Sequence, residues 1–122
     1  PQLLALTDLA SNIVINVPEV WNNSANKFFD ALASGTPILI NGGGWQADLI
    51  RENNAGIVTH SLPIRQAAKK IDKFLHNKSL LKESSENALN LSKKYFDKNS
   101  LVKKVEQVLL LSVNKTNTNL NI

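Results

Sequence analysis

Residues 22–44, NNSANKFFDALASGTPILINGGG, decide the fold that this sequence predicts. The stretch opens with a polar turn, in which Ser24 is the expected N-cap of an amphipathic helix over residues 25–34. A Gly-Thr-Pro break ends that helix, and residues 38–41 follow as a buried strand that leads into the glycines at 42–44. Strand ends and helix starts of this kind are where α/β proteins bind nucleotides and sugar phosphates.

The sequence on both sides continues the alternation of strands and helices. Upstream, we expect a helix over residues 1–10, a β-branched strand over residues 13–17 and a polar loop over residues 19–24. Downstream, we expect a strand at residues 57–59 and helices at residues 45–53, 63–75, 79–95 and 100–113. This alternation indicates an α/β fold, a Rossmann-like parallel sheet with flanking helices. The expected domain spans residues 1–113, and the polar tail at 114–122 is expected to be disordered.

The composition bounds the class of protein. The chain has 122 residues and contains neither cysteine nor methionine. The absence of cysteine excludes a disulfide framework and a cysteine-ligated zinc site. Because the first residue is Pro1, we expect an excerpt of a longer protein. The sequence shows no signal-peptide pattern and no apolar run long enough to span a bilayer, which favours a cytoplasmic location.

The net charge of +4 comes mostly from lysines that follow Arg65. Solvated helix faces account for such a pattern, and an anionic partner is the alternative. Among anionic partners, a membrane surface fits better than nucleic acid, because no aromatic side chains alternate with the lysines to stack on bases. The sequence therefore predicts no nucleic-acid partner and leaves peripheral membrane contact open.

The helix expected at residues 25–34 has a polar face that carries Asn26, Lys27 and Asp30. The free N–H groups and the positive dipole end at its start suit a diphosphate, to which Lys27 would add charge. One turn further along, the Asp30 carboxylate can accept hydrogen bonds from a ribose or sugar diol. The alternative is a plain surface helix with a Lys27–Asp30 ion pair.

The glycine run gives a weaker signal. Gly42, Gly43 and Gly44 lie between a strand and a helix, but their spacing fits neither GxGxxG nor GxxxxGK[ST]. They could contact a ligand, or they could form a tight turn that lets the next helix pack closely. Trp45 and Gln46 could line the same cleft, although Trp45 more simply anchors its own helix.

Taken together, these residues resemble a known family. The segments NKFFDALASGTPILIN and GWQADLIRENNAGIV are similar to the C-terminal donor-binding domain of retaining GT-B glycosyltransferases. The resemblance is to the bacterial family-4 enzymes that build surface polysaccharides, including fucosamine-transferase-like members, and it covers about residues 1–95. Its most specific part is N-S-x-N-K-F-F-D-x-L-A-x-G-x-P at residues 23–37.

The resemblance implies roles for particular residues. Asp30 corresponds to the second of two acidic residues in the family and would bind the donor ribose. The first acidic position falls on Asn22, which carries no charge, and Asn22 and Asn23 would approach the sugar. The loop with Asn23, Ser24, Asn26 and Lys27 would hold the diphosphate. Gly42, Gly43, Gly44 and Trp45 would shape the floor of the cleft.

The resemblance also implies a reaction and partners. The parent enzyme would transfer a sugar from a nucleotide donor, expected to be UDP-linked, to a glycan or lipid-linked acceptor, without a metal or another cofactor. The catalytic basic pair and the acceptor-binding domain are expected upstream of Pro1, so the fragment alone would be inactive. The alternatives are a non-catalytic flavodoxin-like or receiver-like interaction domain, and a degenerate glycosyltransferase domain that serves as a scaffold. The two histidines, His60 and His76, have no metal-ligand spacing.

Overall fold

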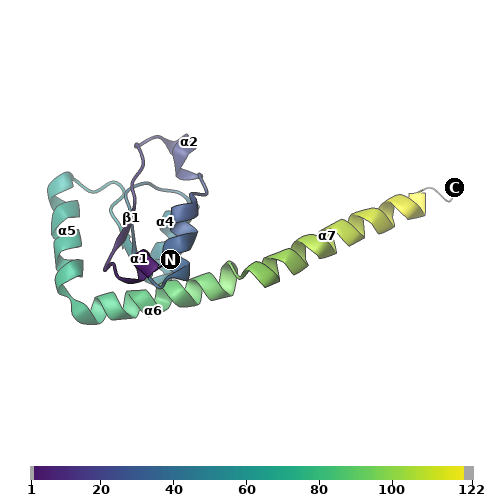
Figure 1. Ribbon diagram of the computed structural model, residues 1–122. Coiled ribbons are helices and arrows are strands. Elements are labelled where there is room, and N and C mark those ends of the chain that lie inside the picture. Colours follow the sequence, from purple (N-terminus) through teal and green to yellow (C-terminus); the bar gives the residue numbers. More distant parts are fainter. Residues whose placement is uncertain (1, 120–122) are drawn as a thin grey trace.

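The computed structural model describes residues 2–119 and has an α/β body from which one helix projects (Figure 1). The elements in chain order are α1 (Gln2–Ala5), β1 (Ala10–Asn12), α2 (Pro18–Trp21), α3 (Asn26–Ala33), β2 (Ile38–Ile40), α4 (Trp45–Asn53), β3 (Gly56–Val58), α5 (Ile64–His76), α6 (Lys78–Tyr95) and α7 (Lys98–Asn119). The three strands form one parallel sheet in the order β1-β2-β3. The predicted α/β class with a parallel sheet and flanking helices is therefore confirmed.

The main core lies between the sheet and helices α3, α4 and α6. Helix α3 supplies Phe28, Ala31 and Leu32, which fall on one face at helical spacing and are fully buried. They pack against the side chains of Ile38 and Ile40, which alternate with Leu39 along β2. Helix α5 lies across the sheet from α4 in Figure 1, and it buries Phe74 there.

The strands β2 and β3 approach each other closely at Gly56. A Cβ placed on Gly56 would lie 2.6 Å from the backbone nitrogen of Ile38. Only glycine fits this position without moving the neighbouring backbone. On the far side of β3, the Lys70 ammonium of α5 donates a hydrogen bond of 3.0 Å to the Val58 carbonyl oxygen.

The first strand is not where the sequence predicted it. β1 spans Ala10–Asn12, whereas the prediction was residues 13–17. The segment after Asn12 leaves the sheet because the backbone of Val14 bonds to the Asn41 side chain and not to a strand. The Val14 N–H donates to Asn41 Oδ1 at 2.9 Å, and Asn41 Nδ2 donates to the Val14 carbonyl at 2.7 Å. Ile13 and Ile15 are consequently exposed, although their β-branched side chains favour strands.

The first helix is also shorter than predicted. Helix α1 ends at Ala5, not at residue 10. The Leu4 carbonyl accepts hydrogen bonds from both the N–H and the hydroxyl of Thr7, and also from the Thr36 hydroxyl at 2.7 Å. These bonds close a turn instead of another helical turn, and the chain continues toward β1.

The loop predicted at residues 19–24 contains a short helix, α2. Pro18 lies in its first turn, where proline is well tolerated, and Glu19 provides an acidic side chain near its start. The predicted N-cap of the next helix is wrong as well. The N-cap of α3 is Ala25, not Ser24, and no side chain caps this helix end.

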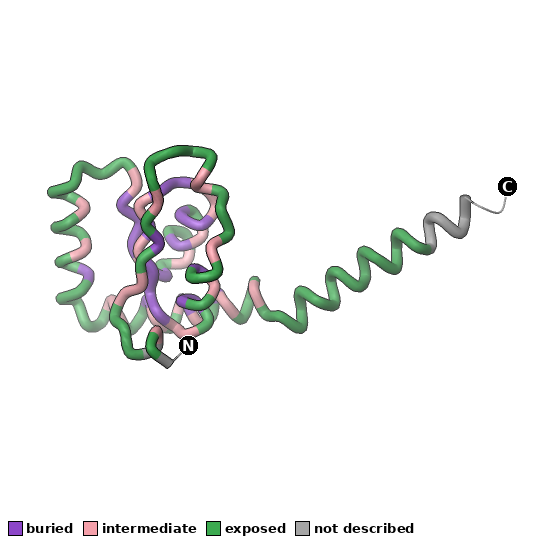
Figure 2. Tube along the Cα trace, turned by 45° about the horizontal axis from the view of Figure 1, so that its top comes forward, coloured by how far each residue is buried: buried purple, intermediate pink, exposed green. Residues whose placement is uncertain are grey.

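The C-terminal helix extends beyond its predicted end. Helix α7 runs from Lys98 to Asn119, past residue 113, so the backbone of residues 114–119 is helical where a disordered tail was expected. Neither glycine nor proline occurs in this stretch to break the hydrogen-bond ladder. Residues 120–122 of the expected tail lie outside the described residues. Figure 2 shows α7 exposed along its length up to residue 113, in contrast to the buried strands of the body.

Candidate functional site

The first turn of α3 is open to a ligand. The N-cap Ala25 makes no side-chain hydrogen bond, and the first N–H groups of an α-helix have no acceptor within the helix, so no side chain occupies this helix end. Asn26, Lys27 and Asp30 are exposed on the helix face opposite the core. Within residues 2–119 the ion pairs are Asp48–Arg51 and Asp72–His76, so the alternative Lys27–Asp30 pair does not form. The predicted polar face is thus present, with its two charged groups unpaired.

A buried pair of amides holds the loop before α3 in place. Asn12 Nδ2 on β1 donates to Gln46 Oε1 on α4 at 2.8 Å, and Gln46 Nε2 donates to the Asn23 carbonyl at 2.8 Å. Both side chains are almost completely buried, with 4% of Asn12 and 3% of Gln46 exposed. Hydrogen bonds of this kind restrict the loop strongly, because breaking one leaves a polar group buried without a partner. Asn23 therefore sits at a fixed position next to the carboxyl ends of β1 and β2.

The predicted residues of this loop divide into two groups. The side chains of Asn22, Asn23 and Ser24 are all exposed, and only the backbone of Asn23 joins the buried network. Asn26, Lys27 and Asp30 follow on the open face of α3. The structure therefore brings the six predicted donor-binding residues to one continuous stretch of surface, from the loop to the first turns of α3.

The glycine turn is covered by a side chain that sequence reasoning missed. A Cβ on Gly42 would lie 2.9 Å from Trp21 Cδ1, and a Cβ on Gly43 would lie 3.0 Å from Trp21 Cε3. The Trp21 ring also meets the His60 ring edge-to-face, with 4.7 Å between the ring centroids. Gly42 and Gly43 are buried and Gly44 partly so. In this structure the glycines make the close approach of an indole possible and do not form an open cleft.

Trp45 has the packing role that was its simpler interpretation. Its ring lies 5.5 Å from the Phe28 ring and 6.3 Å from the Phe29 ring, centroid to centroid. Phe96, at the end of α6, completes this aromatic cluster at 5.0 Å from Phe29. Trp45 therefore anchors α4 to α3.

A small cavity lies between the glycine turn and the loop before α3. Its volume is about 10 Å³, and its walls include Asn12, Trp21, Asn23, Ala25 and Gln46. Two polar atoms in this region, Asn12 Oδ1 and Trp21 Nε1, are buried and have no hydrogen-bond partner. Sequence analysis did not identify Asn12 and Trp21, because each reaches the site across a long sequence separation. The signal available was Pro18-Glu19, which is typical of a helix start and would have placed Trp21 on a short helix.

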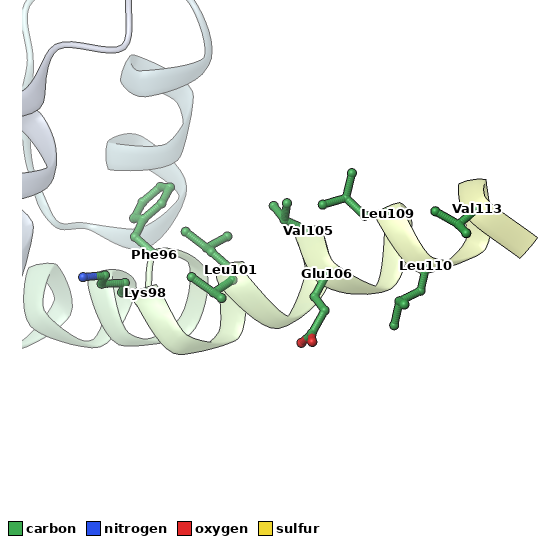
Figure 3. Close-up of a pocket in the computed structure, with 9 residues that line it drawn as sticks. Phe96, Lys98, Leu101, Val105, Glu106, Leu109, Leu110 and Val113 are labelled. Carbon is green, nitrogen blue, oxygen red and sulfur yellow. The ribbon is translucent and has the colours of Figure 1, made fainter.

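Other hollows lie elsewhere on the chain. One of them, about 690 Å³, is an apolar groove along α7 that begins at Phe96. Figure 3 shows Leu101, Val105 and Leu109 on one side of that helix and Glu106 on the opposite side. A polar hollow of about 680 Å³ lies at the start of α5 and includes Asn41 and Thr59 from the carboxyl ends of β2 and β3.

Within residues 2–119, no three histidine, aspartate or glutamate side chains come together as a metal site. In the same part of the chain, no helix combines the length and the hydropathy needed to cross a bilayer. Comparisons of the chain with protein-family models, with curated proteins and with solved structures find no match.

Proposed function

We propose that this chain is the nucleotide-sugar-binding unit of a GT-B glycosyltransferase, acting in the cytoplasm on a donor that is UDP-linked. The observation that carries the proposal is the uncapped first turn of α3, with Lys27 and Asp30 exposed and unpaired beside it. A diphosphate there would accept hydrogen bonds from the first N–H groups of the helix and would face the Lys27 ammonium. The sequence resemblance of residues 23–37 supports the same assignment.

Asp30 is the proposed ribose ligand. Its side chain lies on the same exposed face as Asn26, one helical turn further along. An ionised carboxylate only accepts hydrogen bonds, so it suits a diol, which offers two hydroxyl donors. Nothing in this arrangement requires a metal ion, since the helix N-terminus and Lys27 would balance the diphosphate charge. The acceptor would be a glycan or a lipid-linked glycan bound by another part of the enzyme.

The test is a ligand-observed NMR titration of the chain with UDP, GDP and ADP. We expect saturable UDP binding that Asp30→Ala weakens by about 1–3 kcal/mol, the range for a hydrogen bond to a charged group. Glu52→Ala is the matched control, because it removes an exposed carboxylate from α4 instead. Equal loss of affinity in both variants would mean that Asp30 makes no specific contact with the nucleotide.

A second candidate function is a glycosyltransferase-like scaffold without activity. The observation that favours it is Trp21, which fills the glycine turn next to the proposed donor site. Asn22, which stands where the family has an acidic residue, agrees with this alternative. The same titration separates the two functions, because a scaffold of this kind would bind none of the three nucleotides.

A further inference from the structure

The glycine turn and Trp21 fit together as a shelf and a flat ring. Gly42 and Gly43 have no side chains, and the indole lies within 2.9–3.0 Å of the positions that their Cβ atoms would take. Trp21 is the last residue of α2, a helix of four residues whose N-cap Val17 makes no side-chain hydrogen bond. The neighbouring residues Glu19, Asn22 and Asn23 are exposed. The ring contacts the shelf and the His60 ring and makes no side-chain hydrogen bond.

Asn12 presents an acceptor to the same place, and the buried network fixes its orientation. The Asn23 carbonyl can only accept a hydrogen bond, so Gln46 must direct its NH₂ group toward it. Gln46 Oε1 then faces Asn12 and requires the Asn12 NH₂ group. Asn12 Oδ1 is left as the buried atom without a partner, in a residue that is only 4% exposed.

The position of Trp21 over the shelf carries a free-energy cost. Its Nε1–H is buried without an acceptor, and Asn12 Oδ1, on a residue that lines the same small cavity, is buried without a donor. Each unsatisfied polar group costs the free energy of its lost hydration. Moving the ring out of the shelf would expose the indole N–H to an acceptor and would give Asn12 Oδ1 access to a donor. No side-chain hydrogen bond of Trp21 has to break in this movement.

We propose that the shelf formed by Gly42 and Gly43 is a sugar-binding subsite, and that Trp21 leaves it when a nucleotide sugar binds. A sugar hydroxyl would donate a hydrogen bond to Asn12 Oδ1, and the ring of the sugar would replace the indole on the glycines. Asn23 and Ala25 line the same cavity and lead directly into α3. A sugar on a diphosphate at the α3 N-terminus would therefore reach the shelf. This inference rests on the proposed function.

The first test follows the indole N–H of Trp21 by NMR in the ¹⁵N-labelled chain. The chain has two tryptophans, so Trp21→Phe assigns the two indole signals. The probes are UDP and UDP-N-acetylglucosamine. We expect both to shift the amide signals of Asn26 and Lys27, and only UDP-N-acetylglucosamine to shift the Trp21 indole signal.

The second test removes the ring. Trp21→Ala is expected to bind UDP-N-acetylglucosamine about fivefold more tightly than the unaltered chain. In the unaltered chain, molecules whose Trp21 ring covers the shelf cannot bind the sugar, and this lowers the apparent affinity. UDP affinity should change less than about twofold, since UDP does not use the shelf. Trp21→Phe is the matched control, because it keeps a flat ring on the glycines and should not show the fivefold gain.

The outcomes separate this inference from the proposed function. If UDP-N-acetylglucosamine shifts the α3 signals but neither the Trp21 indole nor the Trp21→Ala affinity responds, the subsite is wrong and the donor site stands. If neither probe binds the unaltered chain or Trp21→Ala, both proposals are overturned. Asn12→Ala in the Trp21→Ala chain should remove the gain for UDP-N-acetylglucosamine, and retention of the gain would contradict the role of Asn12 Oδ1.

Discussion

Helices α3 and α7 carry similar apolar side chains, yet they stand in opposite environments. In α3, Phe28, Ala31 and Leu32 have no exposed surface. In α7, the leucines and valines from Leu101 to Val113 are between 41% and 64% exposed. Each helix has an apolar face at helical spacing, but the sheet and α6 cover only that of α3. An amphipathic pattern thus predicts a helix and its apolar face, whereas burial of that face depends on a second surface that the pattern does not describe.

The substitution expected to cost the most stability lies in the buried face of α3, at the centre of the body. Phe28→Ala should lower the free energy of unfolding by about 3–5 kcal/mol, because it removes a fully buried ring that contacts Phe29, Trp45 and Phe96. Urea denaturation followed by circular dichroism measures the change. A loss below 1 kcal/mol, on the scale of an exposed site, would show that the α3 face is not the core.

A smaller effect is expected where β2 and β3 approach. Gly56→Ala should destabilise the body by about 1–3 kcal/mol, because the new methyl group would push against the backbone of Ile38. Thermal denaturation by calorimetry is a suitable measurement. The control is Lys69→Ala on the exposed part of α5, which shortens a side chain outside the sheet without lowering helix propensity. Equal melting temperatures for Gly56→Ala and the unaltered chain would contradict the close approach.

The smallest effect is expected on α7. Val105→Gln together with Leu109→Gln should change the free energy of unfolding of the body by less than about 0.5 kcal/mol, because both side chains are exposed and glutamine is a good helix former. The same urea titration that measures Phe28→Ala serves here. A cost similar to that of Phe28→Ala would mean that the apolar face of α7 is buried in solution, and would remove the contrast between the two helices.

Much of the fold followed from local signals in the sequence. Helix α3 and strand β2 lie within two residues of their predicted bounds, because Gly35 and Pro37 mark the break between them. Strand β1 was misplaced because the β-branched run at residues 13–17 has the stronger strand propensity. Its position is instead decided by Asn41, whose side chain binds Val14 from 27 residues away. Propensity could not reveal that contact.

The candidate site was predictable to a similar extent. The polar face of α3 could be placed from the spacing of Asn26 and Asp30 alone. Gln46 was predicted as a possible cleft residue, but its hydrogen bonds to Asn12 and Asn23 span 34 and 23 residues and were not foreseen. Trp21 covers the glycines only because the chain turns back through α2 after leaving β1. Contacts at such separations depend on the tertiary fold and leave no periodic signal in the sequence.

The hydrogen bond between Lys70 and Val58 makes the two edges of the sheet unequal. In a parallel strand, every second residue directs its backbone N–H and C=O groups to the same neighbouring strand. Ala55 and Thr59 bond to β2, so the carbonyl of Val58, which lies between alternate positions, faces away from β2. The Lys70 ammonium occupies that acceptor and sets a charge on the outer border of β3. A lysine in this position discourages an incoming strand. A further strand, from this chain or another, would therefore add beside β1, and fibril-like stacking through β3 is disfavoured.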